Sequence, residues 1–262
     1  MQENLDRLKD FFESCQKVAI AYSGGMDSSF LALFAQKAIP DKYVALLVNS
    51  LFMAESELNI ARATARKHGL KIREIRVDVM TDELITSNSE QRCYHCKKAI
   101  FQNLLKECDN AVLCDGSVID DDKDFRPGKK ALAELGVRSP LVECGFTKQM
   151  VAQALKNIDA QEIVRPAQSC LATRIVTNES ITREKLRQIE QGETLLRNAG
   201  LEYFRLRHHG EIARIETSPS NLHDALDKIA SISEELKELG FRHIALDVDG
   251  YTKGSMNRVP EK

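Results

Sequence analysis

The chain has 262 residues, and its 37 basic and 39 acidic side chains give a formal net charge of −2 at pH 7. This near balance produces no overall field that would favour nucleic acid or a membrane as the main partner. No apolar stretch approaches the roughly 20 residues that a membrane span needs, and the charged residues 1–10 predict a helix start rather than a signal peptide. Length and composition favour a cytoplasmic enzyme with one large domain or two small ones.

Apolar runs alternate with amphipathic stretches in the first part of the chain. Hydrophobic periodicity predicts strands at residues 18–22, 42–48, 71–77 and 111–114, separated by helices at residues 30–37, 55–68 and 92–107. This β-α-β-α order predicts an α/β fold with a doubly wound parallel sheet. Ligands of such sheets bind at the carboxyl ends of the strands.

The pattern changes after about residue 174. A helix is expected at residues 181–200 with Thr182 as its N-cap, followed by a hairpin of residues 202–207 and 212–216 around a turn at 208–211. Helices at 221–229 and 233–239 and a last strand at 244–248 complete an α-β-β-α-β order. We therefore predict two domains, residues 1–178 and a small α+β domain of residues 179–262.

A glycine- and serine-rich loop joins the first strand to the first internal helix. It reads Ser23-Gly24-Gly25-Met26-Asp27-Ser28. Glycine lets the backbone turn tightly beside a ligand, serine hydroxyls donate hydrogen bonds, and the helix start presents free N–H groups to an anion. The loop has no lysine and does not match G-x-x-x-x-G-K-[ST]. It predicts a phosphate-binding cradle, and the alternative is an ordinary turn.

This loop resembles that of the PP-loop ATP pyrophosphatases, which split ATP into AMP and pyrophosphate while adenylating a substrate. The resemblance implies that residues 1–178 bind ATP with Mg²⁺. Asp27 is the candidate to assist Mg²⁺, and a structural role for it is the alternative. Asn49, Ser50 and Gly116 also follow predicted strands, so we expect them to border the nucleotide.

Three of the seven cysteines stand out. Cys93 and Cys96 form a C-x-x-C motif, and Cys170 follows later. The motif alone could be a redox pair, half of a zinc site or two unrelated thiols. No residue near Cys170 offers a fourth zinc ligand, whereas three thiolates and an open position suit an iron–sulfur cluster. We interpret the other four as ordinary thiols, namely Cys15, Cys108, Cys114 and Cys144.

The chain as a whole resembles the LarE family of ATP-dependent sulfur transferases, which build the thiocarboxylates of the nickel-pincer nucleotide. The resemblance implies homo-oligomers, trimers or hexamers, and a place for Arg126 in the active site, at the nucleotide. It also implies that residues 1–178 act as the ATP pyrophosphatase domain and that residues 179–262 serve substrate binding or oligomerisation. It runs through segments in the family's order, at residues 23–28, 92–101, 115–141, 166–174, 205–216 and 246–255.

The resemblance also implies the substrate and two possible sulfur sources. The substrate is a nucleotide, pyridinium-3,5-biscarboxylic acid mononucleotide, whose phosphate we expect at Arg174, Arg205 and Arg207. In one type of the family Cys170 gives up its own sulfur. In the other, Cys93, Cys96 and Cys170 hold a [4Fe-4S] cluster that carries sulfide from a donor, and this cysteine set favours the cluster.

Several of these residues also have a structural interpretation, and other functions are alternatives to sulfur transfer. The arginines could form a solvated hairpin face, and Glu216 and Asp224 could bind a metal in an oligomer, although structural roles are commoner. A tRNA-thiolating enzyme should bring a basic surface or an RNA-binding appendage. An amide-forming synthetase would need no cysteine trio, and a zinc-bound nucleotide sensor would turn over no ATP.

Overall fold

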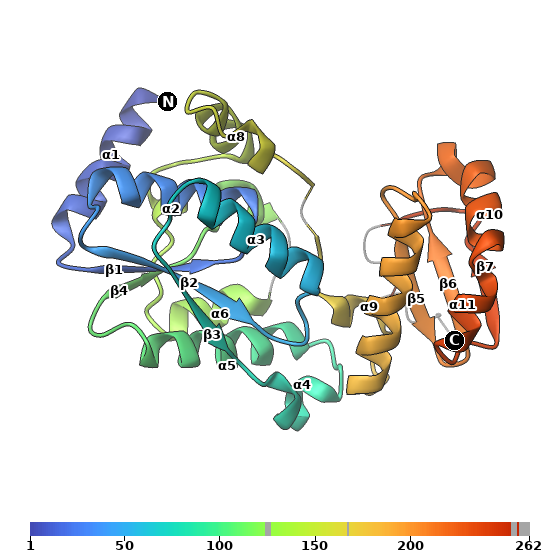
Figure 1. Cartoon of the computed structure of the whole chain (residues 1–262). Coiled ribbons are helices and arrows are strands. Elements are labelled where there is room, and N and C mark those ends of the chain that lie inside the picture. Colours follow the sequence, from blue (N-terminus) through green and yellow to red (C-terminus); the bar gives the residue numbers. More distant parts are fainter. Residues whose placement is uncertain (124–126, 167, 253–255, 257–262) are drawn as a thin grey trace. The chain divides into compact units, whose positions relative to one another are not determined.

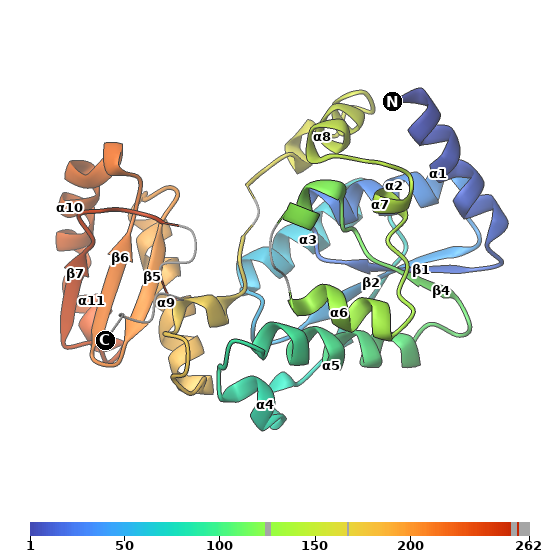
Figure 2. The same cartoon turned by 180° about the vertical axis from the view of Figure 1, so that it is seen from behind.

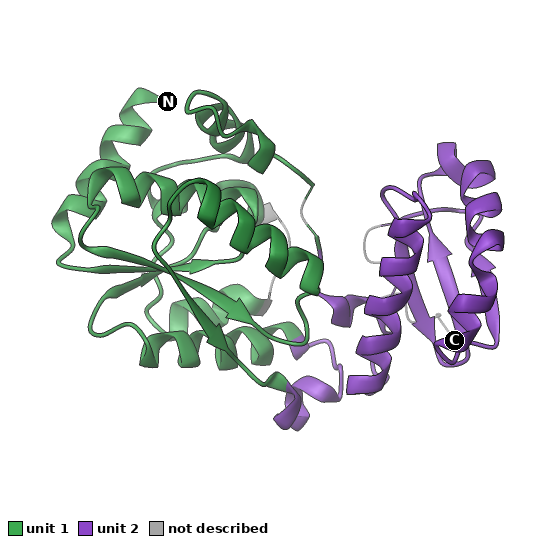
Figure 3. Ribbon diagram, in the orientation of Figure 1, with its two compact units in different colours: residues 1–79, 93–168 green, residues 80–92, 169–262 purple. Residues whose placement is uncertain are grey.

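A computed structural model describes residues 1–123, 127–166, 168–252 and 256 of the chain. Two compact units are distinguished in Figure 3: residues 1–79 with 93–168 form unit 1, and residues 80–92 with 169–262 form unit 2. The expected boundary at 178 differs from this division. Residues 80–92 belong to unit 2 because Asn88 Nδ2 donates to the Val176 carbonyl at 2.8 Å and Ile181 N–H to the Thr86 carbonyl at 2.8 Å. The functional roles given to the two domains stay predictions.

Unit 1 is built on a parallel sheet, which confirms the α/β class. Its strand order is β3-β2-β1-β4. Val18 and Ile20 of β1 pack into the core on one face and Ala19 into the core on the other, because successive side chains of a strand alternate. The strands are β1 (Val18–Tyr22), β2 (Tyr43–Asn49), β3 (Ile72–Arg76) and β4 (Val112–Cys114).

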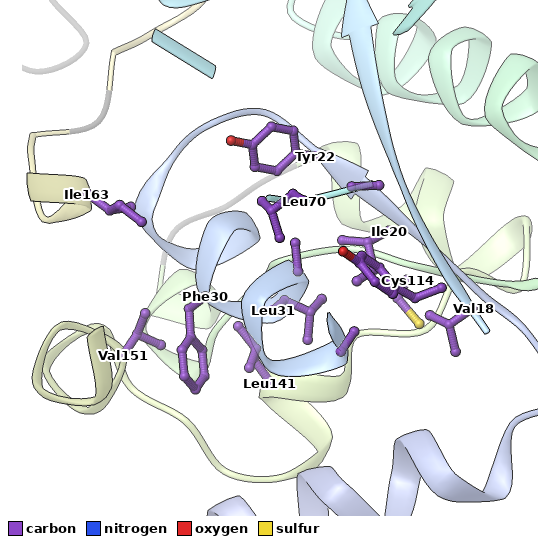
Figure 4. Close-up of a cluster of buried hydrophobic side chains, with 14 of the residues drawn as sticks. Val18, Ile20, Tyr22, Phe30, Leu31, Leu70, Cys114, Leu141, Val151 and Ile163 are labelled. Atoms are coloured by element: carbon purple, nitrogen blue, oxygen red, sulfur yellow. The ribbon is translucent and has the colours of Figure 1, made fainter. Parts of the chain in front are cut away.

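Helices cover both faces of this sheet (Figures 1 and 2). Figure 4 shows part of the larger core, where Ile20 of β1 lies near Leu31 of α2. The helices on this face are α1 (Gln2–Ser14), α2 (Met26–Ala38), α3 (Glu55–Lys67), α7 (Pro140–Glu143) and α8 (Lys148–Lys156). The smaller core on the other face is covered by α5 (Arg92–Lys106) and α6 (Pro127–Glu134).

Unit 2 contains a three-stranded sheet in the order β5-β6-β7. The strands are β5 (Arg205–His209), β6 (Ile212–Glu216), antiparallel to β5, and β7 (His243–Leu246), parallel to β6. The helices are α4 (Glu83–Thr86), α9 (Arg183–Asn198), α10 (Leu222–Ser231) and α11 (Ser233–Glu238). Short 3-10 helices in the two units span Val79–Thr81, Ile119–Lys123, Gln161–Ile163, Leu171–Arg174 and Pro219–Asn221.

Two local expectations in unit 2 have different outcomes. Thr182 does cap α9, since its Oγ1 accepts a hydrogen bond from the Lys185 N–H at 3.1 Å. The expected turn at residues 208–211 is too long, because His208 and His209 pair with β6 and leave two residues for the turn. Gly210 takes φ +61° there, a left-handed conformation that glycine adopts readily.

Candidate active site

The predicted phosphate cradle lies at the carboxyl end of β1. Helix α2 begins at Met26, and its N-cap Gly25 supplies no side-chain hydrogen bond. The first N–H groups of a helix lack intrahelical acceptors, so they are available to an anion. Ser23 Oγ and Ser28 Oγ lie 3.1 Å apart beside them, and the Gly25 N–H donates to Ser23 Oγ at 3.4 Å. Hydroxyls and backbone donors therefore converge, as the sequence predicts for bound phosphate.

Two glycines allow the surrounding backbone to approach this cradle. Gly24 has φ +72°, and a Cβ there would lie 2.5 Å from the Cβ of Ala61 on α3. A Cβ at Gly116, in the loop after β4, would lie 2.8 Å from the backbone nitrogen of Ser28. Neither position accepts a larger side chain without displacing backbone. The loop is consequently packed between α3 and the segment that follows β4.

Asp27 has the electrostatics of a cation ligand. Its Oδ1 is buried and has no hydrogen-bond partner among the described residues. Burial raises the pKa of Asp27 to about 6, a rise that nearby Lys148 opposes and that Asp121 and Asp120 reinforce. Mg²⁺ prefers carboxylate oxygens as ligands and would meet the unsatisfied oxygen. The carboxylate thus fits the expected metal.

The other predicted nucleotide contacts also follow strands. Asn49 is the last residue of β2, and its Nδ2 donates to Glu74 Oε1 at 2.6 Å; Ser50, the next residue, is buried. Asp115, after β4, is buried and accepts hydrogen bonds from Ser139 Oγ at 2.6 Å and from the Ser117 hydroxyl. These strand ends lie in unit 1 with the cradle. Arg126 lies outside the described residues.

The sequence patterns did not predict one ion pair beside the loop of residues 23–28, between Arg165 and Glu57. Arg165 donates to both carboxylate oxygens of Glu57, at 3.0 and 2.7 Å, and to the Gly24 carbonyl at 3.4 Å. Nothing in the local sequence around either residue signals this contact, because the partners are 108 positions apart. Sequence spacing alone could not have found it.

The seven cysteines differ in how exposed their side chains are. Cys93 and Cys96 are three positions apart on α5, so they share a helix face, and Cys93 is exposed. Cys170, in unit 2, is exposed and precedes a 3-10 helix. Of the four other thiols, Cys15 is half-buried, and burial raises the pKa of Cys108, Cys114 and Cys144, which keeps these three protonated. Cys96 is half-buried. Thiolates at Cys93, Cys96 and Cys170 are chemically suited to bind iron, while the structure describes no group of three His, Cys, Asp or Glu side chains placed to hold a metal.

The three predicted phosphate arginines belong to unit 2 but have different surroundings. Arg174 is buried, forms an ion pair with Glu193 at 2.8 Å and donates to the Ser169 carbonyl at 2.7 Å. Arg207 is also buried and donates to the Thr173 carbonyl at 3.0 Å. Arg205 has a buried Nε without a partner among the described residues. Arg205 is thus the one of these three with an unsatisfied buried donor.

Glu216 and Asp224 were candidates for metal binding, with a structural role as the alternative. Both form ion pairs within the fold. Glu216 is fully buried and pairs with Arg207 at 2.6 Å and with Arg214 at 3.0 Å. Asp224 is largely exposed and pairs with Lys228 at 2.7 Å, one helical turn away. Two arginines already compensate the Glu216 carboxylate, so a role in the fold accounts for its burial.

Comparisons with known proteins find similarity over this part of the chain and beyond it. The family described as NAD synthase matches residues 2–113, which include the cradle. An uncharacterized protein of Synechocystis is 33% identical over 100% of both chains. An uncharacterized protein of Methanocaldococcus jannaschii is 31% identical over 94% of both chains.

No helix among the described residues has the length and apolar character needed to cross a bilayer.

One relative carries a functional name. The pyridinium-3,5-bisthiocarboxylic acid mononucleotide synthase of Lactiplantibacillus plantarum is 30% identical over 92% of this chain and 89% of its own. A match of this extent includes residues of both compact units. The chain therefore belongs to the family of this synthase, the LarE family of ATP-dependent sulfur transferases of the PP-loop type.

Proposed function

We propose that this protein converts a carboxylate of pyridinium-3,5-biscarboxylic acid mononucleotide into a thiocarboxylate, with ATP as the activating agent. The near-full-length similarity to the Lactiplantibacillus synthase carries the proposal, because that relative's name states a bisthiocarboxylic acid mononucleotide as its product. The cradle at residues 23–28 supports the ATP step independently.

The chemistry follows from the poor leaving ability of a carboxylate oxygen. The substrate carboxylate attacks the α-phosphorus of ATP, and pyrophosphate leaves. A sulfur nucleophile then attacks the acyl carbon, AMP leaves with the former carboxylate oxygen, and a thiocarboxylate remains. Ser23, Ser28 and the first N–H groups of α2 stabilise the phosphate charge, since their donors are already oriented. Asp27 would hold Mg²⁺, which supplies further charge neutralisation at the phosphates.

For the sulfur source, we favour a [4Fe-4S] cluster held by Cys93, Cys96 and Cys170. The exposure of Cys93 and Cys170 supports this assignment, as does the i, i+3 spacing of Cys93 and Cys96 on α5. A cluster with three protein ligands supplies one iron that can hold an external sulfide. The alternative is that Cys170 donates its own sulfur. Sulfur transfer by that route would require neither Cys93 nor Cys96.

In unit 2, Arg205 is the proposed direct contact to the substrate phosphate. Arg174 and Arg207 stay in the proposed phosphate set, but both are engaged with carboxylates and carbonyls of the fold, so we expect them to contribute less to the phosphate than Arg205 does. The assembly is expected to be a homo-oligomer, a trimer or hexamer, which light scattering of the purified protein tests.

The deciding experiment is iron and sulfide analysis of protein purified without air, combined with single-turnover assays of AMP and thiocarboxylate. The cluster assignment expects about four irons per chain and loss of sulfur transfer in Cys93→Ala. Cys15→Ala is the matched control, since Cys15 is a half-buried thiol away from the motif. Protein without iron, whose Cys170 has lost the mass of H₂S after turnover, would establish the sacrificial route instead. Absence of any thiocarboxylate would refute the proposed function itself.

A further inference from the structure

Two arginines of the proposed phosphate site share one aromatic ring. The guanidinium carbon of Arg205 lies 5.4 Å from the ring centroid of Tyr251, and that of Arg207 lies 5.9 Å from the same centroid. Arg205 and Arg207 are alternate residues of β5, so their side chains leave the strand on the same face. An aromatic face is the negative end of a quadrupole and attracts cations within about 6 Å. Tyr251 therefore contacts both guanidinium groups together.

The charge around the two arginines is uneven. Glu216 neutralises Arg207 through an ion pair at 2.6 Å. Arg205 forms no ion pair with any described carboxylate; its Nη1 donates to the Phe204 carbonyl at 2.6 Å, and its buried Nε has no partner among the described residues. Burial, with the charge of Arg174, lowers the pKa of Arg205, as expected for a cation short of counter-charge. Arg205 can therefore accept an anion. Before an anion binds, the Tyr251 ring stabilises the guanidinium group of Arg205.

A tight turn after β7 sets the position of this ring. The Tyr251 N–H donates to the Thr217 carbonyl at 2.9 Å, and the Gly250 N–H donates to the Asp247 carbonyl at 3.2 Å. Gly250 has φ +70°, and a Cβ there would lie 2.6 Å from the Thr217 oxygen. Asp247 is in turn held by an ion pair with Arg214. The turn is consequently tied to the end of β6, and Tyr251 is placed by backbone contacts rather than by burial, as 44% of it is exposed.

We propose that Tyr251 is the positioning residue of the anion site in unit 2: its ring holds Arg205 beside Arg207 so that the free guanidinium donors meet an anionic group of the carboxylated nucleotide. This inference rests on the proposed function and adds a residue to it. The ring orders a long flexible side chain before the ligand arrives, so part of the entropy cost of binding is already met.

The first test compares Tyr251→Leu with Tyr251→Phe in the sulfur-transfer assay. Leucine removes the quadrupole, and we expect the KM for the nucleotide to rise about tenfold, the equivalent of one partly desolvated cation–π contact. The KM for ATP and kcat should change little, because the cradle lies in unit 1. Phenylalanine keeps the ring and should restore a KM within about twofold of the wild type. Val248→Ala is the control on the same segment, since Val248 is 79% exposed.

The second test does not depend on turnover. The chain contains no tryptophan, so Tyr251→Trp introduces a single tryptophan at the site, whose fluorescence can be followed. Titration with inorganic phosphate, and separately with the dicarboxylated nucleotide, should change its fluorescence saturably, and Arg205→Ala in the same background should abolish the change. Tyr203→Trp, at a residue 66% exposed in the same unit, should not respond.

The outcomes separate this inference from the proposed function. A nucleotide KM unaffected by Tyr251→Leu, or a fluorescence change that persists without Arg205, overturns the role of Tyr251. If the wild-type protein makes no thiocarboxylate, the proposed function fails, and the phosphate titration still decides the anion site: a response that depends on Arg205 supports it, and no response overturns it.

Discussion

Arg165 and Glu57 join the PP-loop to helix α3. The guanidinium group donates to both oxygens of the carboxylate, at 3.0 and 2.7 Å, and one of its nitrogens also donates to the Gly24 carbonyl at 3.4 Å. Glu57 precedes Ala61 by one helical turn, and Ala61 is the residue against which Gly24 packs. The side chains of the pair are only 22% and 18% exposed. The pair therefore holds the backbone of the loop on the side of α3.

We expect Arg165→Met to weaken ATP binding without removing a phosphate ligand. Loss of a two-point, charge-assisted contact should allow the loop to move and raise the KM for ATP about 5- to 30-fold, corresponding to about 1–2 kcal/mol. Steady-state assays of pyrophosphate release measure this. Lys9→Met is the control, because the Lys9–Glu13 pair on α1 is exposed at both ends. Equal effects of the two substitutions would contradict a specific role for Arg165.

Asp27 should impose an acid limit on ATP use. Burial raises the pKa of Asp27 from 3.8 to about 6, so in the free enzyme the carboxylate gains a proton as the pH falls through about 6. The protonated group is a poor ligand for Mg²⁺, and kcat/KM for ATP should fall over the same range. A pH profile of pyrophosphate release checks this, and Mg²⁺ in excess should shift the limit to lower pH. A profile that is flat between pH 5 and 7 would remove Asp27 from this role.

The same pKa predicts the stability of Asp27→Asn. Because the pKa in the folded state is raised, the folded chain binds this proton more tightly than the unfolded chain does. The stabilisation is fully present below the unfolded pKa and is lost as the pH rises toward about 6, so the ionised carboxylate destabilises the fold at pH 7. Asparagine should raise the free energy of unfolding at pH 7 by about 1–2 kcal/mol and make no such difference at pH 4. Urea denaturation at both pH values, without Mg²⁺, measures it.

Glu216→Gln should be strongly destabilising. Glu216 is fully buried and pairs with Arg207 and Arg214, so removal of its charge leaves the buried Arg207 without its carboxylate and leaves Arg214 with Asp247 alone among the described carboxylates. Breaking a buried pair in this way costs about 3–5 kcal/mol. Asp224→Asn is the matched control, since Asp224 is 65% exposed and its pair with Lys228 should contribute less than about 1 kcal/mol. Urea denaturation of the two variants checks the difference, and similar midpoints would contradict a structural role for Glu216.

Local pattern was sufficient for the elements that carry the phosphate cradle. The apolar run at Val18–Tyr22, the glycines and the following helix are contiguous, and each has a backbone preference of its own. The alternation of strands and helices then predicts a parallel sheet, whose carboxyl ends bring Ser23, Asn49 and Gly116 into one unit. The prediction of the hairpin turn was less exact: the sequence placed His208 and His209 in the turn, whereas both residues belong to β5 and pair with β6.

The sequence by itself thus predicted the fold class from its alternating strands and helices, and the family from motifs in a set order; the nucleotide contacts of the cradle stay a prediction. The tertiary structure decided how the charged residues are used. Arg174 and Arg207 read like phosphate ligands, yet each pairs with a buried carboxylate, Glu193 and Glu216. Arg205 instead has a buried Nε without a partner among the residues that the structure describes, and it lies beside Tyr251. A buried charge requires compensation, and its partner is set by packing between distant segments, which no local pattern records.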